Sequence, residues 1–217
     1  CNEMGISMWE VVDAAKTKPY GFQAFYPGPG LGGHCIPLDP YYLSWKAREY
    51  GFHTSMIESS MMINDKMPEY CVDRAAKLLN RRAKKAMNGS KVLVLGVAYK
   101  QDIDDYRESP ALRVIEELEK EGAVVTYFDP WVKEYKYKGQ VRQSIPALTE
   151  QVLKDADLVM VTTAHTNVDY DMVQKNADLR QQKRDEEYPE PRQHRGSVRR
   201  RFRLMPGPSG WHGPLAG

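Results

Sequence analysis

The sequence predicts an α/β fold in which a helical segment precedes a parallel sheet flanked by helices. Two observations predict it. Apolar residues recur at helical spacing over roughly the first eighty residues, and a strand, a helix and a second strand then follow one another from residue 91. With 217 residues, 41% of them hydrophobic, the chain is long enough to bury a substantial core.

The first part of the chain has the pattern of three helices. Residues 5–16 predict a helix that ends before Lys18. Asp39-Pro40 is a helix-start signature, because aspartate can cap and proline suits a first turn, and this helix should end at Gly51. A longer helix is predicted over about residues 55 to 82, with Pro68 expected to kink or split it. A helix of this length in a small domain usually packs against another chain or domain.

The second part of the chain predicts a β-α-β unit. A basic, turn-rich joint at 81–90 marks a domain boundary, and the apolar run KVLVLGV at 91–97 then has the length of a buried strand. ALRVIEELEKEG is an amphipathic helix ended by glycine, and AVVTYFDP is a second strand. A helix near 147–155 and a strand at 157–163 repeat the pattern, so the sheet is predicted to be parallel.

The pattern disappears from about residue 178. Residues 180–217 carry nine Lys or Arg against four Asp or Glu and no strand pattern, so we expect a disordered or out-of-frame tail. The alternative is a basic arm that binds RNA or an acidic surface. The basic cluster has no folded aromatic platform, so nucleic acid is not an expected partner.

Compartment and redox state follow from what the sequence lacks. It has no run of eighteen apolar residues and no signal-peptide pattern, so we expect a cytoplasmic protein with no membrane partner. Its cysteines, Cys1, Cys35 and Cys71, are far apart and outside any C-x-x-C spacing, which argues against disulfides and a zinc site. The chain begins in a helical pattern at a cysteine, so we expect it to be a fragment of a larger protein.

The stretch GPGLGGHCIPLDP at 28–40 is the candidate functional loop, and three roles are considered for it: a dinucleotide cradle, a metal site and a loop that carries a nucleophile. A dinucleotide cradle should follow a buried strand, which FQAFYP is not, and His34 beside Cys35 without a second ligand pair is weak evidence for a metal. A nucleophile fits better, because Cys35 comes just before a predicted helix start, where a thiolate is favoured, and Asp39 follows within one turn. A tight turn with a buried cysteine and a capping aspartate remains the alternative.

Three longer stretches carry a resemblance to a known family. FYPGPGLGGHCIPLDPYYLSWKAREYGF, INDKMPEYCVDRAAKLLN and KVLVLGVAYKQDIDDYRESPALRVIEELEKEGAVVTYFDPWV resemble the central and C-terminal parts of the UDP-glucose/GDP-mannose dehydrogenase family. The likeness covers roughly residues 1–177 and is nearest to the branch that oxidises UDP-N-acetyl-hexosamines. Its most specific element is a G-x-G-x-G-G-x-C-x-P-x-D loop followed, some sixty residues later, by Y-K and D-x-R-E-S-P.

The resemblance implies an architecture and partners. It implies a central helical dimerisation segment over residues 1–85, a Rossmann-like UDP-sugar-binding domain over 86–177, and the tail over 178–217. We expect this chain to lack the family's N-terminal NAD-binding Rossmann domain, so the chain alone is not expected to turn over. NAD is the implied cofactor, a UDP-sugar the implied substrate, and the long helix the implied core of a homodimer. The alternative is a non-catalytic module that binds UDP-sugar or dimerises.

The resemblance also implies a catalytic pair. The family oxidises the C6 hydroxymethyl of a nucleotide sugar to a carboxylate with two NAD and two hydride transfers. By resemblance, Cys35 adds to the C6 aldehyde to form a thiohemiacetal, the second hydride leaves a thioester, and water releases the acid. Asp39 would activate that water.

The remaining implied residues bind substrate and cofactor. Lys100 would reach the substrate and Arg107 would contact NAD; the alternatives are a solvated lysine and a partner for Asp104 or Asp105. The loop that closes on the sugar and uridine, with Tyr99 as a wall, aligns with Tyr26, Pro27, Gly28, Gly30, Leu31 and Gly32.

Overall fold

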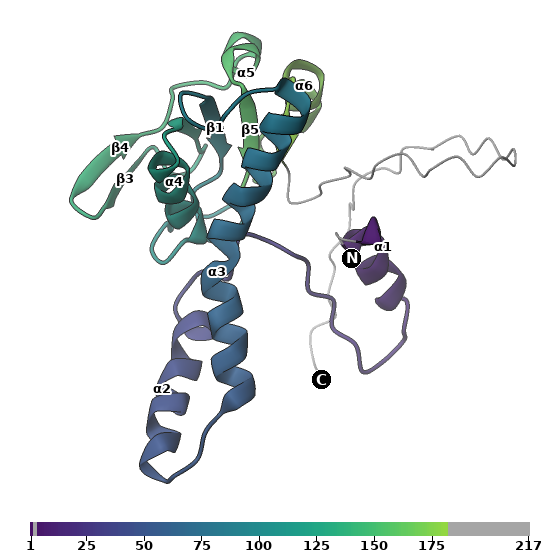
Figure 1. Ribbon diagram of the computed structural model, residues 1–217, viewed down its shortest axis with the longest axis vertical. Coiled ribbons are helices and arrows are strands. Elements are labelled where there is room, and N and C mark those ends of the chain that lie inside the picture. Colours follow the sequence, from purple (N-terminus) through teal and green to yellow (C-terminus); the bar gives the residue numbers. More distant parts are fainter. Residues whose placement is uncertain (2–3, 182–217) are drawn as a thin grey trace, which may run out of the picture. The chain divides into compact units, whose positions relative to one another are not determined.

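The computed structural model of the chain describes Cys1 and residues 4–181, without the side chains of Arg180 and Gln181 (Figure 1). The α-helices are α1 (Met8–Ala15), α2 (Cys35–Glu49), α3 (Ser55–Leu78), α4 (Pro110–Lys120), α5 (Glu150–Asp155) and α6 (Tyr170–Asn176). A π-helical turn, η2 (Leu79–Ala83), follows α3 directly. The strands are β1 (Lys91–Leu95), β2 (Val124–Phe128), β3 (Glu134–Tyr137), β4 (Gln140–Gln143), β5 (Leu158–Val161) and β6 (Arg180–Gln181).

Four of these strands form a parallel sheet in the order β2-β1-β5-β6. Leu93 of β1 pairs with Thr126 of β2 on one side and with Val159 of β5 on the other. Strand β6 pairs with β5, so the parallel pattern extends into the first residues of the segment for which the sequence predicts no strand. The rest of the expected tail lies outside the described residues.

Helices cover both faces of this sheet, which explains the unbroken apolar run of β1. Successive side chains of a strand point to opposite faces. Val92 and Val94 therefore pack in one core with α3, η2 and α4, through Val72, Ala75, Leu79, Leu112, Ile115 and Leu118. Leu93 and Leu95 pack in a second core with α5 and α6, through Leu153 and Val173. The predicted α/β class with a parallel sheet is confirmed.

Helix α3 is the long helix that the sequence predicts, and it runs through Pro68 without being split (Figure 1). Its last turns enter the core beside the sheet, whereas Met56, Met62 and Ile63 near its start are exposed. The domain boundary predicted at 81–90 stays a prediction. The last turns of α3, before it, share one core with β1, after it. Within the described part of the chain, no helix, α3 included, is long and apolar enough to cross a membrane.

Helix α2 begins at Cys35, five residues before Pro40, the first helical residue predicted with Asp39 as the cap. Asp39 is therefore not a cap, and the cap position is occupied by His34, whose side chain makes no capping hydrogen bond. Pro37 is tolerated because the first amides of a helix have no internal partner, whereas Pro40 removes one internal hydrogen bond. Cys35 and Asp39 are thus four residues apart on one helix, a spacing that puts them on the same face.

Strands β3 and β4 form an antiparallel hairpin that the sequence analysis does not anticipate. Lys138 and Gly139 connect the strands with φ angles of 47° and 83°, as a two-residue type I′ turn requires. Tyr135 of β3 is buried, and its ring lies 5.0 Å from the ring of Tyr127 in β2. The hairpin is therefore attached to the core through this aromatic pair.

Candidate active site

The glycines that precede Cys35 pack against the segment between β1 and α4. A Cβ atom on Gly32 would lie 2.7 Å from the Cβ of Tyr99 and 2.9 Å from both the carbonyl oxygen of Glu108 and the Cδ of Pro110. A Cβ atom on Gly33, whose φ is +85°, would lie 3.1 Å from the ring of Tyr99. Glycine is needed here because any side chain would push the two segments apart.

A side chain of α3 holds the same loop from another direction. The backbone N–H of Leu31 donates a hydrogen bond of 2.7 Å to Oδ1 of Asn64. Asn64 lies four residues before Pro68, which has no N–H, so the Asn64 carbonyl lacks its usual helical donor. A Cβ atom on Gly30 would lie 3.5 Å from that carbonyl oxygen. The loop therefore rests on α3 at the turn that Pro68 leaves open.

Cys35 is exposed, and it is the first residue of α2. It follows Gly33 by two residues, which span at most about 7 Å of chain, and Gly33 touches Tyr99. Lys100, also exposed, follows Tyr99 directly. The glycine contact thus brings the segment that carries Cys35 beside the segment that carries Lys100, although the two are far apart in sequence.

Tyr26 makes its contacts with α1. Its ring stacks on Trp9 at a centroid distance of 4.9 Å, and its hydroxyl donates to Oδ1 of Asp13 at 2.9 Å. Nζ of Lys16 donates to the same hydroxyl at 3.0 Å. Pro27 beside it is exposed. Tyr26 therefore contacts α1, whereas Gly32 and Gly33 pack on Tyr99.

Arg107 is paired with Asp105, one of the two partners that the sequence suggests. Nε and a terminal nitrogen of Arg107 each lie 2.9 Å from a carboxylate oxygen of Asp105. The hydrogen bonds from Arg107 lower the pKa of Asp105 to about 2, and the charge of His34 acts in the same direction. The Arg107 side chain is still 69% exposed, so the guanidinium is accessible to a ligand.

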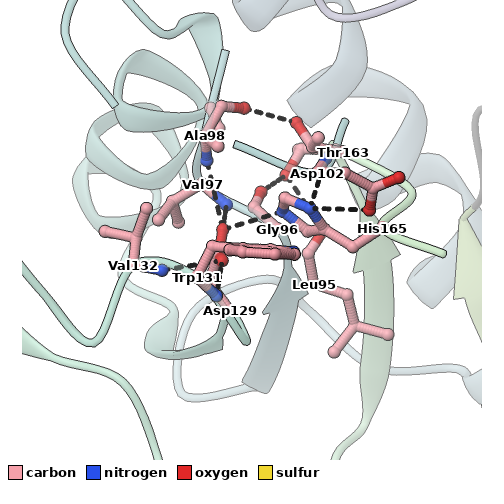
Figure 2. A network of polar contacts seen from close by, with 12 residues as sticks. Leu95, Gly96, Val97, Ala98, Asp102, Asp129, Trp131, Val132, Thr163 and His165 are labelled. Atoms are coloured by element: carbon pink, nitrogen blue, oxygen red, sulfur yellow. Dashed lines mark hydrogen bonds and ion pairs between the residues drawn. The ribbon is translucent and has the colours of Figure 1, made fainter. Parts of the chain in front are cut away.

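A buried polar cluster stands at the carboxyl ends of β1, β2 and β5, and the sequence analysis does not anticipate it. Figure 2 shows Asp129, which follows β2, beside His165, which follows β5. Both side chains are fully buried, and Nε2 of His165 lies 3.1 Å from Oδ2 of Asp129. The second ring nitrogen, Nδ1, accepts a hydrogen bond of 3.0 Å from the backbone N–H of Asp102.

Two threonines that directly follow β5 donate hydrogen bonds to the segment that follows β1. The Thr163 hydroxyl donates to the carbonyl of Ala98 at 2.6 Å, and the Thr162 hydroxyl donates to the carbonyl of Gly96. The sequence signal for such a cluster is a polar residue directly after a buried strand. Asp129 in FDP and Thr162 in TTAH carry this signal. Ligands of open α/β sheets bind at this carboxyl edge, so the cluster lies where a nucleotide is expected.

The described residues do not form a dinucleotide cradle. A cradle needs glycines that admit the pyrophosphate and a helix that starts directly after the first strand. Here a Cβ on Gly96 would overlap the carbonyl of Thr163, so this glycine serves packing, and α4 starts only at Pro110. Arg107 is the predicted cofactor-binding residue, and it contributes a single guanidinium that suits a pyrophosphate.

The fold and this edge define a doubly wound α/β protein of the nucleotide-binding type, preceded by helices that carry an exposed cysteine. Two sequence models of one family match the chain. The central domain of the UDP-glucose/GDP-mannose dehydrogenase family matches residues 1–66, and the UDP binding domain of that family matches residues 93–184. The chain belongs to the UDP-glucose/GDP-mannose dehydrogenase family.

Relatives with an assigned activity agree with this family. The UDP-N-acetyl-D-mannosamine dehydrogenase of Methanocaldococcus jannaschii is 32% identical over 75% of this chain and 34% of its own length. The UDP-N-acetyl-D-glucosamine 6-dehydrogenase of Pseudomonas aeruginosa is 39% identical over 60% of this chain and 30% of its own. This chain therefore spans about a third of the length of the relatives that it matches.

Solved structures show the same architecture. The UDP-D-ManNAc dehydrogenase from Pyrococcus horikoshii matches 84% of this chain and 41% of its own, with a TM-score of 0.70 and 29% identity. An NDP-N-acetyl-D-galactosaminuronic acid dehydrogenase from Methanosarcina mazei matches 81% and 38%, with a TM-score of 0.67 and 30% identity. The expected order of a helical segment and a UDP-binding domain is confirmed.

Proposed function

We propose that this chain is the substrate-binding part of an NAD-dependent UDP-sugar 6-dehydrogenase and carries its nucleophile. The observation that supports the proposal most is the packing of Gly32 and Gly33 on Tyr99, since it unites the cysteine loop with the carboxyl edge of the sheet. The names of the relatives favour a UDP-N-acetyl-hexosamine as the substrate, and UDP-glucose, which the name of the family contains, is the next candidate.

Cys35 is the nucleophile in this proposal. From the first residue of α2 its Sγ adds, as the thiolate, to the C6 aldehyde of the bound sugar, and a C–S bond forms. The tetrahedral adduct, a thiohemiacetal, keeps the aldehyde from escaping. Removal of a hydride from that adduct leaves a thioester. Water then attacks the thioester carbon, the C–S bond breaks, and the carboxylate is released with the thiol restored.

Asp39 and Lys100 assist these steps. Asp39 is exposed on the same face of α2 as Cys35, where its carboxylate can accept a proton from the attacking water. Lys100 supplies a cation to the oxyanion or to the diphosphate, and Tyr99 forms a wall of the same site. Backbone amides of the loop that contains Gly30, Leu31 and Gly32 offer hydrogen bonds to the sugar without side-chain bulk.

A nicotinamide cofactor supplies the hydride acceptor for both oxidations. Among the residues that the resemblance implies, Arg107 is the one assigned to it, because its guanidinium is accessible and can bond pyrophosphate oxygens. Asp105 orients that guanidinium through two hydrogen bonds. Most of the cofactor's contacts are therefore expected from chain outside residues 4–181.

A homodimer built on α3 completes the proposal. The first turns of α3 and neighbouring α2 expose Trp45, Met56, Met62 and Ile63, and a face this apolar is typical of an interface. Sedimentation of the chain across a concentration series tests the dimer. A monomer at all concentrations would contradict this part.

The function is tested by calorimetric titration with UDP-N-acetylglucosamine, UDP-N-acetylmannosamine and UDP-glucose, together with NADH formation on the same protein. Cys35→Ser is expected to bind the preferred sugar within about threefold of the unchanged protein, because the hydroxyl keeps the size of the side chain, and to form no NADH. Cys1→Ser is the matched control. Since the chain alone is not expected to turn over, binding without NADH formation by the unchanged chain agrees with the proposal. NADH formation that Cys35→Ser abolishes would show that the chain is active by itself, and no binding of any UDP-sugar would contradict the proposal.

A further inference from the structure

The buried pair at the carboxyl edge has no role in the steps above, yet it is fully engaged. Oδ1 of Asp129 accepts from the backbone N–H groups of Trp131 and Val132, at 2.8 and 2.9 Å. Oδ2 accepts from the N–H groups of Val97 and Ala98, at 2.7 and 3.2 Å. Figure 2 shows this carboxylate holding the turn after β2 and the chain that leaves β1.

The hydrogen bonds fix the protonation of His165. Nδ1 accepts from the Asp102 N–H, so it carries no proton, and Nε2 must then carry the proton that it donates to Asp129. An imidazolium would place a second donor against the Asp102 N–H. The side chain of Asp102 faces the same ring, with Oδ1 3.8 Å from Nδ1. These two hydrogen bonds therefore assign the Nε2–H tautomer to the ring.

The two partners bind opposite ends of one short segment. Asp129 holds its start at Val97 and Ala98, and His165 holds its end at Asp102. Asp102 has a φ of +61°, in the left-handed region that aspartate adopts more readily than most non-glycine residues. Tyr99 and Lys100 lie between the two anchors.

We propose that His165 is a positioning residue, which through Nδ1 fixes the backbone at Asp102 and thereby orients Tyr99 and Lys100 toward the UDP-sugar. The proposal rests on the function proposed above for Tyr99 and Lys100. Each ring nitrogen has a separate role, since Nε2 attaches the ring to Asp129 and Nδ1 holds the segment. The acceptor at Nδ1, rather than the bulk of the ring, is then the feature that the site requires.

A matched pair of substitutions separates these two roles. In His165→Asn the amide oxygen can take the place of Nδ1 and keep an acceptor for the Asp102 N–H. In His165→Gln the longer amide can reach the place of Nε2 and donate to Asp129, but it leaves that N–H without an acceptor. Both variants lose the ring, so both lose packing of a similar kind.

Three readouts on the full chain test the proposal: the unfolding midpoint, deuterium uptake over residues 96–106, and affinity for UDP-N-acetylglucosamine and UDP. We expect His165→Gln to raise deuterium uptake and to bind about tenfold more weakly, whereas His165→Asn stays within about threefold of the unchanged protein. Equal losses of UDP-sugar affinity in both variants, in proportion to the lowering of their unfolding midpoints, would overturn the proposal. His165 would then act only through the packing of its ring.

A second measurement needs no variant. Nitrogen chemical shifts of the imidazole in the unchanged chain should identify the neutral Nε2–H tautomer of His165 at neutral pH. An imidazolium or the Nδ1–H tautomer would overturn the proposal, because the Asp102 N–H would have no acceptor. Failure of UDP-sugar binding in the unchanged chain would instead count against the proposed function, since deuterium uptake and the tautomer are measured without ligand.

Discussion

Gly32 lies so close to Tyr99 that a Cβ atom on the glycine would approach the Cβ of the tyrosine to 2.7 Å. This contact joins the loop that ends at Cys35 to the segment that leaves β1 at the edge of the sheet. Real Cβ atoms do not approach one another so closely. The backbone fixes the place of each Cβ atom, so no side-chain rotation could relieve the overlap. The spacing between the two segments therefore depends on the missing side chain.

Gly32→Ala is expected to separate the cysteine loop from Tyr99. The added methyl group also meets the Glu108 carbonyl at 2.9 Å, so we expect a loss of about 1–3 kcal/mol in the free energy of unfolding, as overpacking usually costs. UDP-sugar affinity should fall as well. Thermal unfolding and calorimetric titration measure both.

Gly51→Ala is the control for Gly32→Ala. A Cβ there meets nothing within 4 Å, although its φ of +69° makes alanine unfavourable by about 1 kcal/mol. It should lower stability without changing affinity. Unchanged UDP-sugar affinity in Gly32→Ala would mean that the glycine contact has no part in the site.

Asn64→Leu is expected to loosen the same loop from α3, because Leu31 loses the acceptor of its 2.7 Å hydrogen bond. The loss should be about 1 kcal/mol, since the bond is exposed, and deuterium uptake at residues 28–34 should rise. Asn64→Asp keeps an acceptor oxygen and should behave like the unchanged protein. Equal uptake in the two variants would rule out this role for the Asn64 amide.

Arg107→Gln is expected to raise the pKa of Asp105 from about 2 toward its ordinary value of 3.8. Because the pKa in the folded protein is below that in the unfolded chain, the pair stabilises the fold above about pH 4, and that contribution is lost as the pH falls toward 2. Carboxyl carbon shifts followed by NMR measure the titration. An unchanged midpoint for Asp105 in the variant would contradict the assignment.

Asp129→Asn is expected to lower the free energy of unfolding by an amount on the order of 3 kcal/mol, because an amide group would face donors that a buried carboxylate now satisfies. Burial alone would raise the pKa of Asp129, but the bonds from His165 and the backbone amides hold it below its ordinary value. Acid should therefore weaken the fold as this carboxylate is protonated.

The exposed Asp171 of α6 gives a control for that comparison, since Asp171→Asn changes the same chemical group at the surface. It should stay within about 0.5 kcal/mol of the unchanged protein. Chemical denaturation measures both variants. Similar losses in the two would show that the network around Asp129 contributes little.

Sequence reasoning identifies the elements whose pattern is local. The run KVLVLGV, the glycine-terminated helix after it and the long helix near residue 55 all appear in the structure, since periodicity and end signals fix such elements. The start of α2 is predicted five residues late, because Asp39-Pro40 has the form of a cap and a first helical residue, while the chain already turns helical after Gly33. The hairpin is not predicted, because its anchor, Tyr135 on Tyr127, is a contact between strands.

The candidate site likewise contains residues that the sequence identifies and residues that it does not. Cys35, Lys100 and Arg107 stand in motifs that the resemblance identifies, whereas the Asp129–His165 pair exists only once β1, β2 and β5 are aligned in register. Likewise, nothing in GPGLGG indicates that its glycines face Tyr99 rather than a ligand. A single sequence carries no direct signal for such contacts between distant segments.

The central claim is that the cysteine loop and the Tyr99–Lys100 segment form one UDP-sugar site, and alkylation of Cys35 tests it most directly. Iodoacetamide labelling, followed by peptide mass spectrometry, compares the exposed Cys35 with the exposed Cys1 in the same molecules. If the account is right, a UDP-N-acetyl-hexosamine slows labelling of Cys35 severalfold and leaves Cys1 unchanged. If the sugar binds, as calorimetry would reveal, and Cys35 still reacts at its original rate, the cysteine lies outside the site and the account is contradicted.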